Sequence, residues 1–344
     1  MEEDLSLSVD ALDPTTIWIS DKLFVSVIII TKNRCEDLNR CLKSLFDQTM
    51  KDFEVIVVDG ESSDSTLNVV NGYRVRLFVD KTKDLSYLRN FGAGKARGDV
   101  IAFIDDDAQA DKQWLEQAVS TLQEKPFLVA VGGPTVIIGK QTMLGLYVGS
   151  TESIFLKIFR SIYETVVAEN NLFEICKFFS SGAFSIGSSL PWSRKIRGLV
   201  DVDYLSSCNF AIRKGIFLSF NGFDSAFPTT HHDTDFFLRI KKKKLKFIFN
   251  PKMVVFHHVN QNAKTRPKSF ELASDFAFFY CRHCRIRNIA GALRLIVNIC
   301  MLNMFWVYQA MKTGNLKCLS WTVGFLQGFK RFLKTDGLHP RIMR

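Results

Sequence analysis

Residues 100–107 read Val-Ile-Ala-Phe-Ile-Asp-Asp-Asp, a run of five apolar residues that ends in three consecutive carboxylates. An uninterrupted apolar run of this length is typical of a strand that is buried on both faces. Ligands of open α/β sheets bind at the carboxyl ends of the strands, where these aspartates would lie. Three adjacent carboxylates repel one another, and a divalent cation such as Mg²⁺ would relieve the repulsion. The alternative is an acidic, solvated loop after a strand.

Two segments upstream show the same pattern of an apolar run with a polar end. Residues 54–59 read Glu-Val-Ile-Val-Val-Asp and precede a stretch rich in helix N-cap residues, which predicts a strand, a turn and a helix. Residues 25–30 read Val-Ser-Val-Ile-Ile-Ile, continue into Thr-Lys-Asn-Arg at 31–34 and lead into an amphipathic helix. Three strands therefore bring polar ends to one edge of a sheet, which is the geometry of a nucleotide site.

With these motifs the chain resembles glycosyltransferases of family 2, whose nucleotide-diphospho-sugar transferase fold is called GT-A. The resemblance runs from Val25 to about Val259 and consists of four motifs in the family's order, at residues 25–34, 57–66, 85–107 and 222–239. It implies an α/β fold with a Rossmann-like mixed sheet flanked by helices. It also implies transfer of a sugar from a nucleotide-diphospho-sugar to a hydroxyl group, with a divalent cation, Mg²⁺ or Mn²⁺, as cofactor.

The resemblance assigns the donor site to residues that follow the first strands. Thr31 and Asn33 would border the base pocket, and Asp59 would accept a hydrogen bond from the pyrimidine or the ribose. Arg89 matches a family arginine and would bind diphosphate oxygens in bidentate fashion. From the residues alone, two alternatives stay open: Asp59 as a helix N-cap and Arg89 as a surface residue.

The triplet at 105–107 matches the family's Asp-X-Asp motif. The resemblance implies that Asp107 contacts the metal directly and that Asp105 contacts the ribose or a metal-bound water, with Asp106 among the donor-binding residues. Such a metal holds the diphosphate and stabilises the charge that grows on it as it leaves.

The resemblance also implies a third metal ligand at the end of a strand predicted over 254–258, which ends in His257 and His258. His257 aligns best with a family histidine that binds the metal. Imidazole accepts Mn²⁺ more readily than Mg²⁺, so this ligand would favour manganese. A structural role for the histidine is the alternative.

The catalytic base is expected between Gly222 and Arg239, where the family has Gly-Phe-Asp, a loop, and Glu-Asp-X-Asp at the start of a helix. Asp233 falls on the position of the base, and Asp235 on that of the helix acid behind it. A carboxylate opposite the leaving diphosphate takes the proton of the attacking hydroxyl, which gives a single displacement with inversion. The alternative is that both are helix acids favoured by the dipole.

Two further residues of these motifs have open roles. His232 stands where the family more often has Glu, and it would tune the pKa of Asp233 or bind the acceptor. Asn209 lies in a segment, 202–213, that resembles the family strand before the acceptor loop, with Ser207 where Gly is usual. Asn209 would touch the donor sugar or serve in a turn. Residues 139–200 carry no motif, and the resemblance to GT-A enzymes implies that the acceptor binds there.

The 344 residues suffice for one large α/β domain with an appendage. We expect an N-terminal arm over residues 1–22, a catalytic domain over 23–262 and a basic, aromatic helical region over 263–344. The catalytic domain would divide into a donor half, 23–135, and an acceptor half, 136–262. The eight cysteines form no disulfide framework and no signal sequence is apparent, so we expect a reduced, cytoplasmic protein.

The positive charge of the chain is concentrated in its last quarter. Residues 264–344 hold 14 Lys and Arg against 3 Asp and Glu, whereas the remainder holds 31 against 32. With its aromatic residues, this region suits helices in the interface of an anionic bilayer, which would place the protein on the inner face of the cytoplasmic membrane. The alternative is a helical bundle that packs on the domain or on a second subunit, as in a homodimer. The apolar stretch 293–311 contains Arg294, Asn298 and Asn303, too polar for a confident transmembrane span.

The expected partners are a UDP- or dTDP-sugar donor and a glycan or lipid-linked acceptor, as in polysaccharide biosynthesis of the cell envelope, and no nucleic acid. Two other classes stay open. A nucleotidyltransferase of related fold needs a glycine-rich loop after its first strand, and residues 30–34 contain no glycine. A protein that only binds sugar nucleotides would tolerate loss of the carboxylates, yet Asp59, Asp105, Asp107 and Asp233 are all present.

Overall fold

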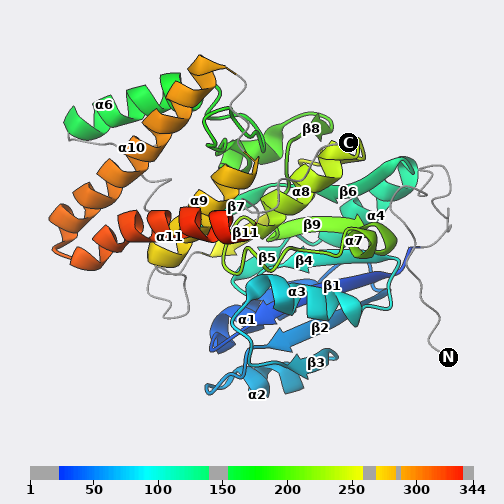
Figure 1. Cartoon of the computed structure of the whole chain (residues 1–344). Coiled ribbons are helices and arrows are strands. Elements are labelled where there is room, and N and C mark those ends of the chain that lie inside the picture. The colour runs from blue at the N-terminus through cyan, green and yellow to red at the C-terminus, as the bar shows by residue number, and fades with distance from the viewer. Residues whose placement is uncertain (1–22, 139–153, 259–268, 284–287, 336–344) are drawn as a thin grey trace.

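The computed structural model describes residues 23–138, 154–258, 269–283 and 288–335, so the arm predicted over residues 1–22 lies outside the described residues. An eight-stranded mixed sheet with the order β3-β2-β1-β4-β9-β6-β10-β8 forms the centre of the molecule (Figure 1). Its strands are β1 (Val25–Thr31), β2 (Phe53–Asp59), β3 (Arg76–Val79), β4 (Val100–Ile104), β6 (Leu128–Gly132), β8 (Val200–Asp201), β9 (Asn209–Arg213) and β10 (Lys246–Phe249).

The register of the parallel strands brings their carboxyl ends to one edge. Thr31 at the end of β1 pairs with Asp59 at the end of β2. On the other side of β1, Ile28 pairs with Phe103 of β4, so the aspartates after β4 follow at the level of the end of β1. The predicted convergence of three polar strand ends is therefore confirmed.

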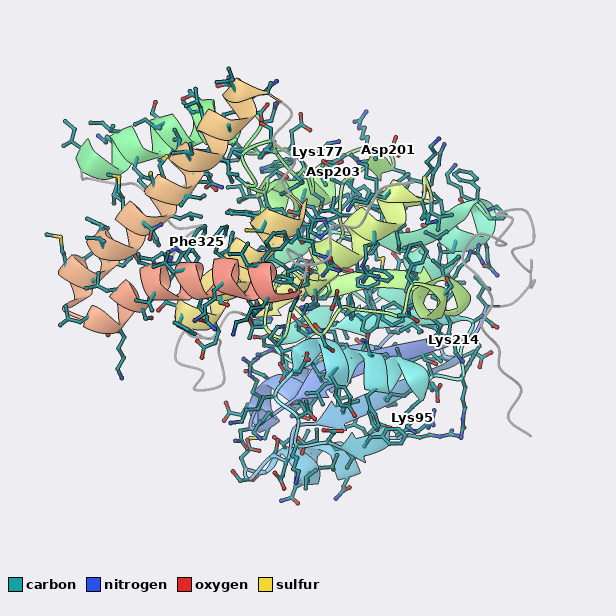
Figure 2. The ribbon with its side chains drawn as sticks, in the orientation of Figure 1. Lys95, Lys177, Asp201, Asp203, Lys214 and Phe325 are labelled. Atoms are coloured by element: carbon teal, nitrogen blue, oxygen red, sulfur yellow. The ribbon has the colours of Figure 1, made fainter. Side chains whose placement is uncertain are left out.

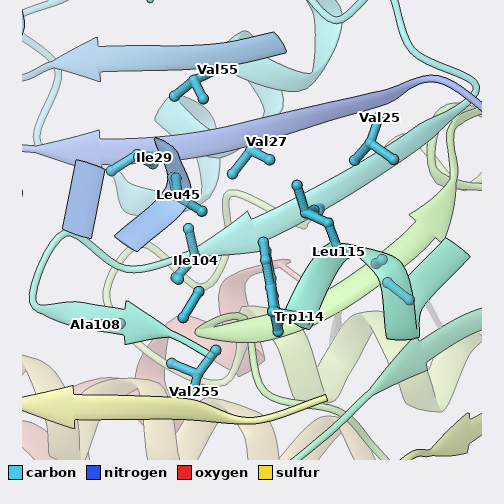
Figure 3. Packing of buried hydrophobic residues seen from close by; sticks show 14 of the residues in the cluster. Val25, Val27, Ile29, Leu45, Val55, Ile104, Ala108, Trp114, Leu115 and Val255 are labelled. Carbon is cyan, nitrogen blue, oxygen red and sulfur yellow. The ribbon is translucent and has the colours of Figure 1, made fainter. Parts of the chain in front are cut away.

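Helices cover both faces of this sheet because successive residues of the buried strands point to opposite sides. Val25, Val27 and Ile29 of β1 belong to one core cluster, and Ile28 belongs to another. Figure 3 shows the first cluster, in which Trp114 packs under the sheet. The helices that contribute to these two clusters are α1 (Cys35–Phe46), α2 (Thr66–Asn71), α3 (Leu85–Gly94), α4 (Trp114–Glu124), α7 (Lys214–Ser219) and α8 (His232–Lys242).

A second, three-stranded sheet begins immediately after the aspartate triplet. It has the order β5-β11-β7 and comprises β5 (Ala108–Ala110), β7 (Thr135–Ile138) and β11 (Val255–His258). β11 runs antiparallel to β5, and His257 pairs with Ala108. This pairing brings the two histidines at the end of β11 beside the triplet, although 150 residues separate Asp107 from His257.

The predicted helical appendage is present in the C-terminal part of the chain. α9 (Ser269–His283) packs against α11 (Ser320–Thr335), and α10 (Ile289–Thr313) packs against the π-helical turn η3 (Tyr163–Val167) that follows α6 (Ile154–Ile162). Figure 1 shows α6 and α10 extending away from the sheet, while α9 and α11 pack together beside the domain. The buried Phe278 and Phe279 of α9 lie in one cluster with Phe227. For α9, the prediction of a helix that packs on the domain is correct.

α10 combines an apolar composition with specific polar contacts. Over Ile289–Lys312 it is long and apolar enough to cross a membrane by length and composition alone, with a mean hydropathy of 1.6. By this measure the helix is more apolar than its polar residues Arg294, Asn298 and Asn303 suggested, although length and composition alone do not establish a membrane span. Within the protein, Asn298 Nδ2 donates to the carbonyl of Ser181 and to the Tyr280 hydroxyl, both at 3.0 Å. Asn303 accepts a hydrogen bond from Thr322 of α11 at 2.8 Å.

Candidate active site

The three aspartates after β4 are surrounded by cationic and polar side chains. Arg34, which follows β1, places its Nη1 atom 2.8 Å from Asp106 Oδ1 and 3.0 Å from Asp107 Oδ2. The Thr31 hydroxyl donates to Asp106 at 2.8 Å. Burial raises the pKa of Asp106 to about 7, against the opposing effect of Arg34. The solvated-loop alternative is wrong, since Asp106 and Asp107 are both buried.

Arg34 was quoted in the first motif of the sequence but was given no role. Its position could have been inferred from the strand register, because the parallel pairing of β1 and β4 sets residues 31–34 beside 106–107. What the register does not give is the side chain's direction. In the structure this side chain points back toward the triplet.

Arg89 links Asp105 to the helix that carries the predicted base. Its Nη2 atom lies 2.7 Å from Asp105 Oδ1, and its Nη1 atom lies 3.1 Å from His232 Nε2. Only 6% of Arg89 is exposed, so the alternative of a surface residue is wrong. Burial and the adjacent guanidinium hold the pKa of His232 well below its usual range, so the ring is neutral and Nε2 accepts from Arg89. His232 also lies 3.3 Å from the Ser207 hydroxyl.

Asp233 and Asp235 sit in the first turn of α8 but in different surroundings. Asp233 accepts hydrogen bonds from the backbone N–H of Ser207 at 2.8 Å and of Thr234 at 2.7 Å. Asp235 is fully buried, 2.8 Å from Arg239 Nε and 2.8 Å from His283 Nε2. His283 had no predicted role, and it serves to bind α9 to α8. Asp233 is thus placed beside the segment before β9, whereas Asp235 joins helices.

The residues predicted to form the base pocket lie together at the ends of β1 and β2. Asp59 is buried and accepts hydrogen bonds from the backbone N–H and the hydroxyl of Ser62. It is not the N-cap of α2, which is Ser65, so that alternative is wrong. Asn33 is exposed, has a positive φ of 53°, and its side-chain oxygen accepts from the N–H of Ser63 at 2.7 Å. Side-chain contacts therefore hold the loops after β1 and β2, which would flank the nucleotide base.

Asn209 does not face the site, contrary to the sequence suggestion that it touches the donor sugar. It is 1% exposed and donates to the carbonyls of Pro134 and Met253, each at 2.8 Å. Its own oxygen accepts from the indole N–H of Trp114 at 2.8 Å. One amide thus joins β9 to α4 and to the loops before β7 and β11.

We expect Asn209→Ala to lower the free energy of unfolding by roughly 2–4 kcal/mol, because three buried partners would lose their hydrogen bonds. Denaturant unfolding measures the effect, with Asn68→Ala at an exposed position of helix α2 as a control of small cost. Unchanged stability together with weaker donor binding would instead restore the role of Asn209 in the donor site.

A cavity of about 390 Å³ adjoins the triplet. Asp105, Cys208 and His257 line it together with residues 183–186, 188–189 and 204–206, and with side chains of α9 and α10. Part of the segment expected to grip the acceptor, 139–153, lies outside the described residues, but residues 183–189 do contribute to the wall. Lys177 and Asp203 are labelled close together in Figure 2, and Asp203 accepts a hydrogen bond from the N–H of Phe178 at 3.0 Å, which joins the two segments.

The side chains at the triplet fit a divalent cation. His257 Nε2 lies 2.8 Å from Asp107 Oδ1, so a carboxylate and an imidazole predicted as ligands are in contact. One donor atom each from Asp105, Cys208 and His257 lies within 4.8 Å of the others, and no other group of this kind is found in the described part of the chain. Cys208 was not among the predicted site residues, since the sequence predicted of the cysteines only that they are reduced.

Comparisons with known proteins show that the chain is similar to glycosyltransferases. Residues 26–184 match the model of the family described as Glycosyl transferase family 2. A Methanococcus voltae enzyme, a dolichyl N-acetyl-alpha-D-glucosaminyl phosphate 3-beta-D-2,3-diacetamido-2,3-dideoxy-beta-D-glucuronosyltransferase, is 25% identical over 70% of this chain and 68% of its own. Glycosyltransferase AglE of Haloferax volcanii is 35% identical over 29% of this chain. The match spans about a third of AglE, 35% of its length.

Two solved structures share the fold. The mannosyltransferase PcManGT of Pyrobaculum calidifontis, solved with GDP-Man and Mn²⁺, is 15% identical, with a TM-score of 0.51 over 94% of this chain and 88% of its own. GalNAc-T7, solved with UDP, GalNAc and Mn²⁺, is 14% identical, with a TM-score of 0.55 over 92% of this chain and 57% of its own. At these identities the likeness shows the fold alone, which is GT-A, as predicted.

Proposed function

The chain belongs to glycosyltransferase family 2, and on that premise we propose that it transfers a sugar from a nucleotide-diphospho-sugar to a hydroxyl group of a glycan or lipid-linked acceptor. One observation carries this proposal. A chain of contacts runs from Asp105 through Arg89, His232 and Ser207 to Asp233, in four steps of 2.7, 3.1, 3.3 and 2.8 Å. It connects the carboxylates of the donor side with the carboxylate proposed as the base.

In this mechanism, Asp233 takes the proton of the acceptor hydroxyl as the new glycosidic bond forms. The N–H groups of Ser207 and Thr234 orient its carboxylate and stabilise its negative charge. Arg89 and Arg34 hold the carboxylates on the donor side and supply positive charge near the leaving diphosphate. Attack from the side opposite the diphosphate inverts the anomeric carbon.

The cation would be held by Asp107, Asp105 and His257. When bound, a divalent cation supplies Lewis-acid stabilisation of the diphosphate. Mn²⁺ in the two structures of the same fold supports a divalent cation in general, and the imidazole favours Mn²⁺ over Mg²⁺. Thr31, Asn33 and Asp59 are proposed to receive the nucleotide, with UDP or dTDP as the nucleotide part.

The acceptor is proposed to bind in the cavity beside Asp105. The lining contains the rings of Tyr163, Phe184, Tyr204, Phe276 and Tyr280, and no lysine or arginine among the described residues. Aromatic rings without cations fit an uncharged sugar or an apolar chain better than a phosphate. The relative from M. voltae is named for a dolichyl-phosphate-linked sugar, which supports a lipid-linked acceptor here.

A panel of labelled nucleotide sugars, offered with soluble glycans and lipid-linked sugars, tests the proposed function. We expect one donor to give a labelled acceptor and a nucleoside diphosphate. Release of pyrophosphate would instead identify a nucleotidyltransferase, and binding without any product would identify a sugar-nucleotide-binding protein. The proposed division into a catalytic part, 23–262, and a C-terminal part, 263–344, can be tested in the same assay with truncated chains.

The outer faces of the appendage support a peripheral membrane contact. Large apolar side chains are exposed on α6, α10 and α11, namely Ile154, Ile158, Ile162, Leu293, Ile296, Met304, Val307, Met311, Val323, Leu326, Phe329 and Leu333. Exposed lysines stand among them at 157, 312, 317, 330 and 334. An apolar surface with interspersed cations matches the interface of an anionic bilayer. A cytoplasmic enzyme held there would meet a lipid-linked acceptor.

We expect the protein to sediment with vesicles that contain anionic lipid and to be released in part by high salt. Each lysine near such a surface contributes about 1 kcal/mol, or roughly fivefold in binding. The double variant Lys330→Glu, Lys334→Glu should therefore bind far more weakly, whereas Lys244→Glu, Lys252→Glu on the catalytic domain should bind normally. A detergent-free dimer that stays in the supernatant at low salt would show that these faces join two subunits instead.

A further inference from the structure

Cys208 lies at the entrance to strand β9, where the antiparallel pairing with β4 brings it next to the aspartate triplet. Asn209, the first residue of β9, pairs with Ile104, the last residue of β4. Cys208 precedes Asn209 and Asp105 follows Ile104, so the antiparallel pairing sets these two residues side by side. His257 reaches the same place from β11. Three segments that are distant in sequence therefore each deliver one side chain with a metal-binding atom.

The three donor atoms are close enough to share one ion. A carboxylate oxygen of Asp105, the sulfur of Cys208 and a ring nitrogen of His257 all lie within 4.8 Å of one another. All three residues line the cavity beside the triplet. Cys208 also packs in the core cluster under the sheet, and a purely apolar role is the alternative.

We infer that Cys208 completes a three-donor site with Asp105 and His257 that takes a thiophilic divalent cation, Zn²⁺ or Cd²⁺, in preference to Mg²⁺. Mg²⁺ requires oxygen ligands, whereas a set of one oxygen, one nitrogen and one sulfur suits Zn²⁺ and its heavier analogue. On binding, the thiol proton passes to solvent and the thiolate becomes the ligand. This inference rests on the proposed function in one respect, since it gives the proposed donor-site cation a thiolate ligand.

The experiment is a titration of the full-length protein with Cd²⁺ in the absence of nucleotide, followed by the ultraviolet charge-transfer absorption of a cadmium–thiolate bond. The wild-type protein should show this absorption, and Cys208→Ser should lose it. Mutation of a residue that only hydrogen-bonds to a metal ligand typically weakens metal binding by about 10-fold to 100-fold. Loss of a direct ligand, as in Cys208→Ser, should weaken Cd²⁺ binding by at least that factor. Competition with Zn²⁺ should remove the signal, and Mg²⁺ should not.

Cys176 provides the matched control, because it is buried and lines the same cavity but does not belong to the three-donor cluster. Cys176→Ser should keep both the absorption and the affinity. His257→Ala should weaken the signal although every thiol is retained, and this variant tests the inference even if Cys208→Ser fails to fold. Equal absorption in wild type and Cys208→Ser, or no effect of His257→Ala, would overturn it.

The outcomes separate this inference from the proposed function. Sugar transfer without a signal that depends on Cys208 would refute the thiolate ligand and leave the glycosyltransferase proposal intact. A Cys208-dependent signal in a protein that transfers no sugar would support the thiolate ligand and refute the proposed reaction.

Discussion

Asp107→Ala is expected to abolish sugar transfer and the metal-dependent binding of nucleoside diphosphate, while the protein stays folded. The Asp107 carboxylate contacts His257, which is also a proposed metal ligand, and the Arg34 guanidinium, whose positive charge partly offsets the negative charge of the three aspartates. Removal of one of three adjacent carboxylates relieves their repulsion, and Arg34 keeps its contact with Asp106. The fold should therefore tolerate the change.

The measurement for Asp107→Ala is the affinity for a nucleoside diphosphate with and without Mn²⁺, together with the turnover of donor. Asp111→Ala, in the turn before α4, removes a nearby carboxylate outside the triplet and serves as the control with normal affinity and turnover. Full activity of the wild-type enzyme in metal-free buffer would refute the role of Asp107.

Asp233→Asn is expected to lower turnover by about 100-fold or more, as for the loss of a general base, with donor affinity nearly unchanged. An amide has the size of the carboxylate but takes no proton at neutral pH. It offers one oxygen instead of two, so one of the N–H groups of Ser207 and Thr234 loses its acceptor. The stability of the variant should fall by only about 1–3 kcal/mol for that reason.

Asp235→Asn is the matched control for Asp233→Asn. Asp235 is buried between Arg239 and His283, so its neutralisation should cost about 3–5 kcal/mol of stability and leave the chemical step intact in the folded fraction. Normal turnover of Asp233→Asn with loss of turnover in Asp235→Asn would show that the base lies two residues further along the helix.

The central strands and their common edge could be predicted from the sequence, because parallel strands that are buried on both faces have nearly continuous apolar sequences. Residues 100–104 are entirely apolar, residues 25–30 and 54–58 each contain one polar residue, and a polar residue follows each segment. Once the strands are parallel and in register, their polar ends must meet. The resemblance to family 2 added residues that no periodicity reveals, such as Arg89 and Asp233.

Contacts between distant segments could not be predicted in the same way. Cys208 lies beside Asp105 and His257, and His283 bonds to Asp235, but the sequence around these two residues carries no sign of those neighbours. For Arg34, the strand register gives the neighbourhood but not the direction of the side chain. Asn209 shows the converse, because a polar residue beside the site proved to satisfy buried groups of three other segments.

The C-terminal helices could be predicted as helices but not placed. Their aromatic and apolar residues are compatible with burial in a core, in a dimer or in a bilayer, since all three environments select the same residue types. The structure assigns α9 to the core through Phe278 and Phe279, and leaves apolar residues of α10 and α11 exposed. Figure 2 labels Phe325 of α11, which packs in a cluster with residues of α9.

The most direct test of the central claim is an NMR spectrum of the products formed from an anomerically defined nucleotide sugar. A family 2 glycosyltransferase with Asp233 as its base should yield a glycoside whose anomeric configuration is opposite to that of the donor, together with one equivalent of nucleoside diphosphate. A glycoside with the configuration of the donor, or pyrophosphate in place of the nucleoside diphosphate, would contradict the account.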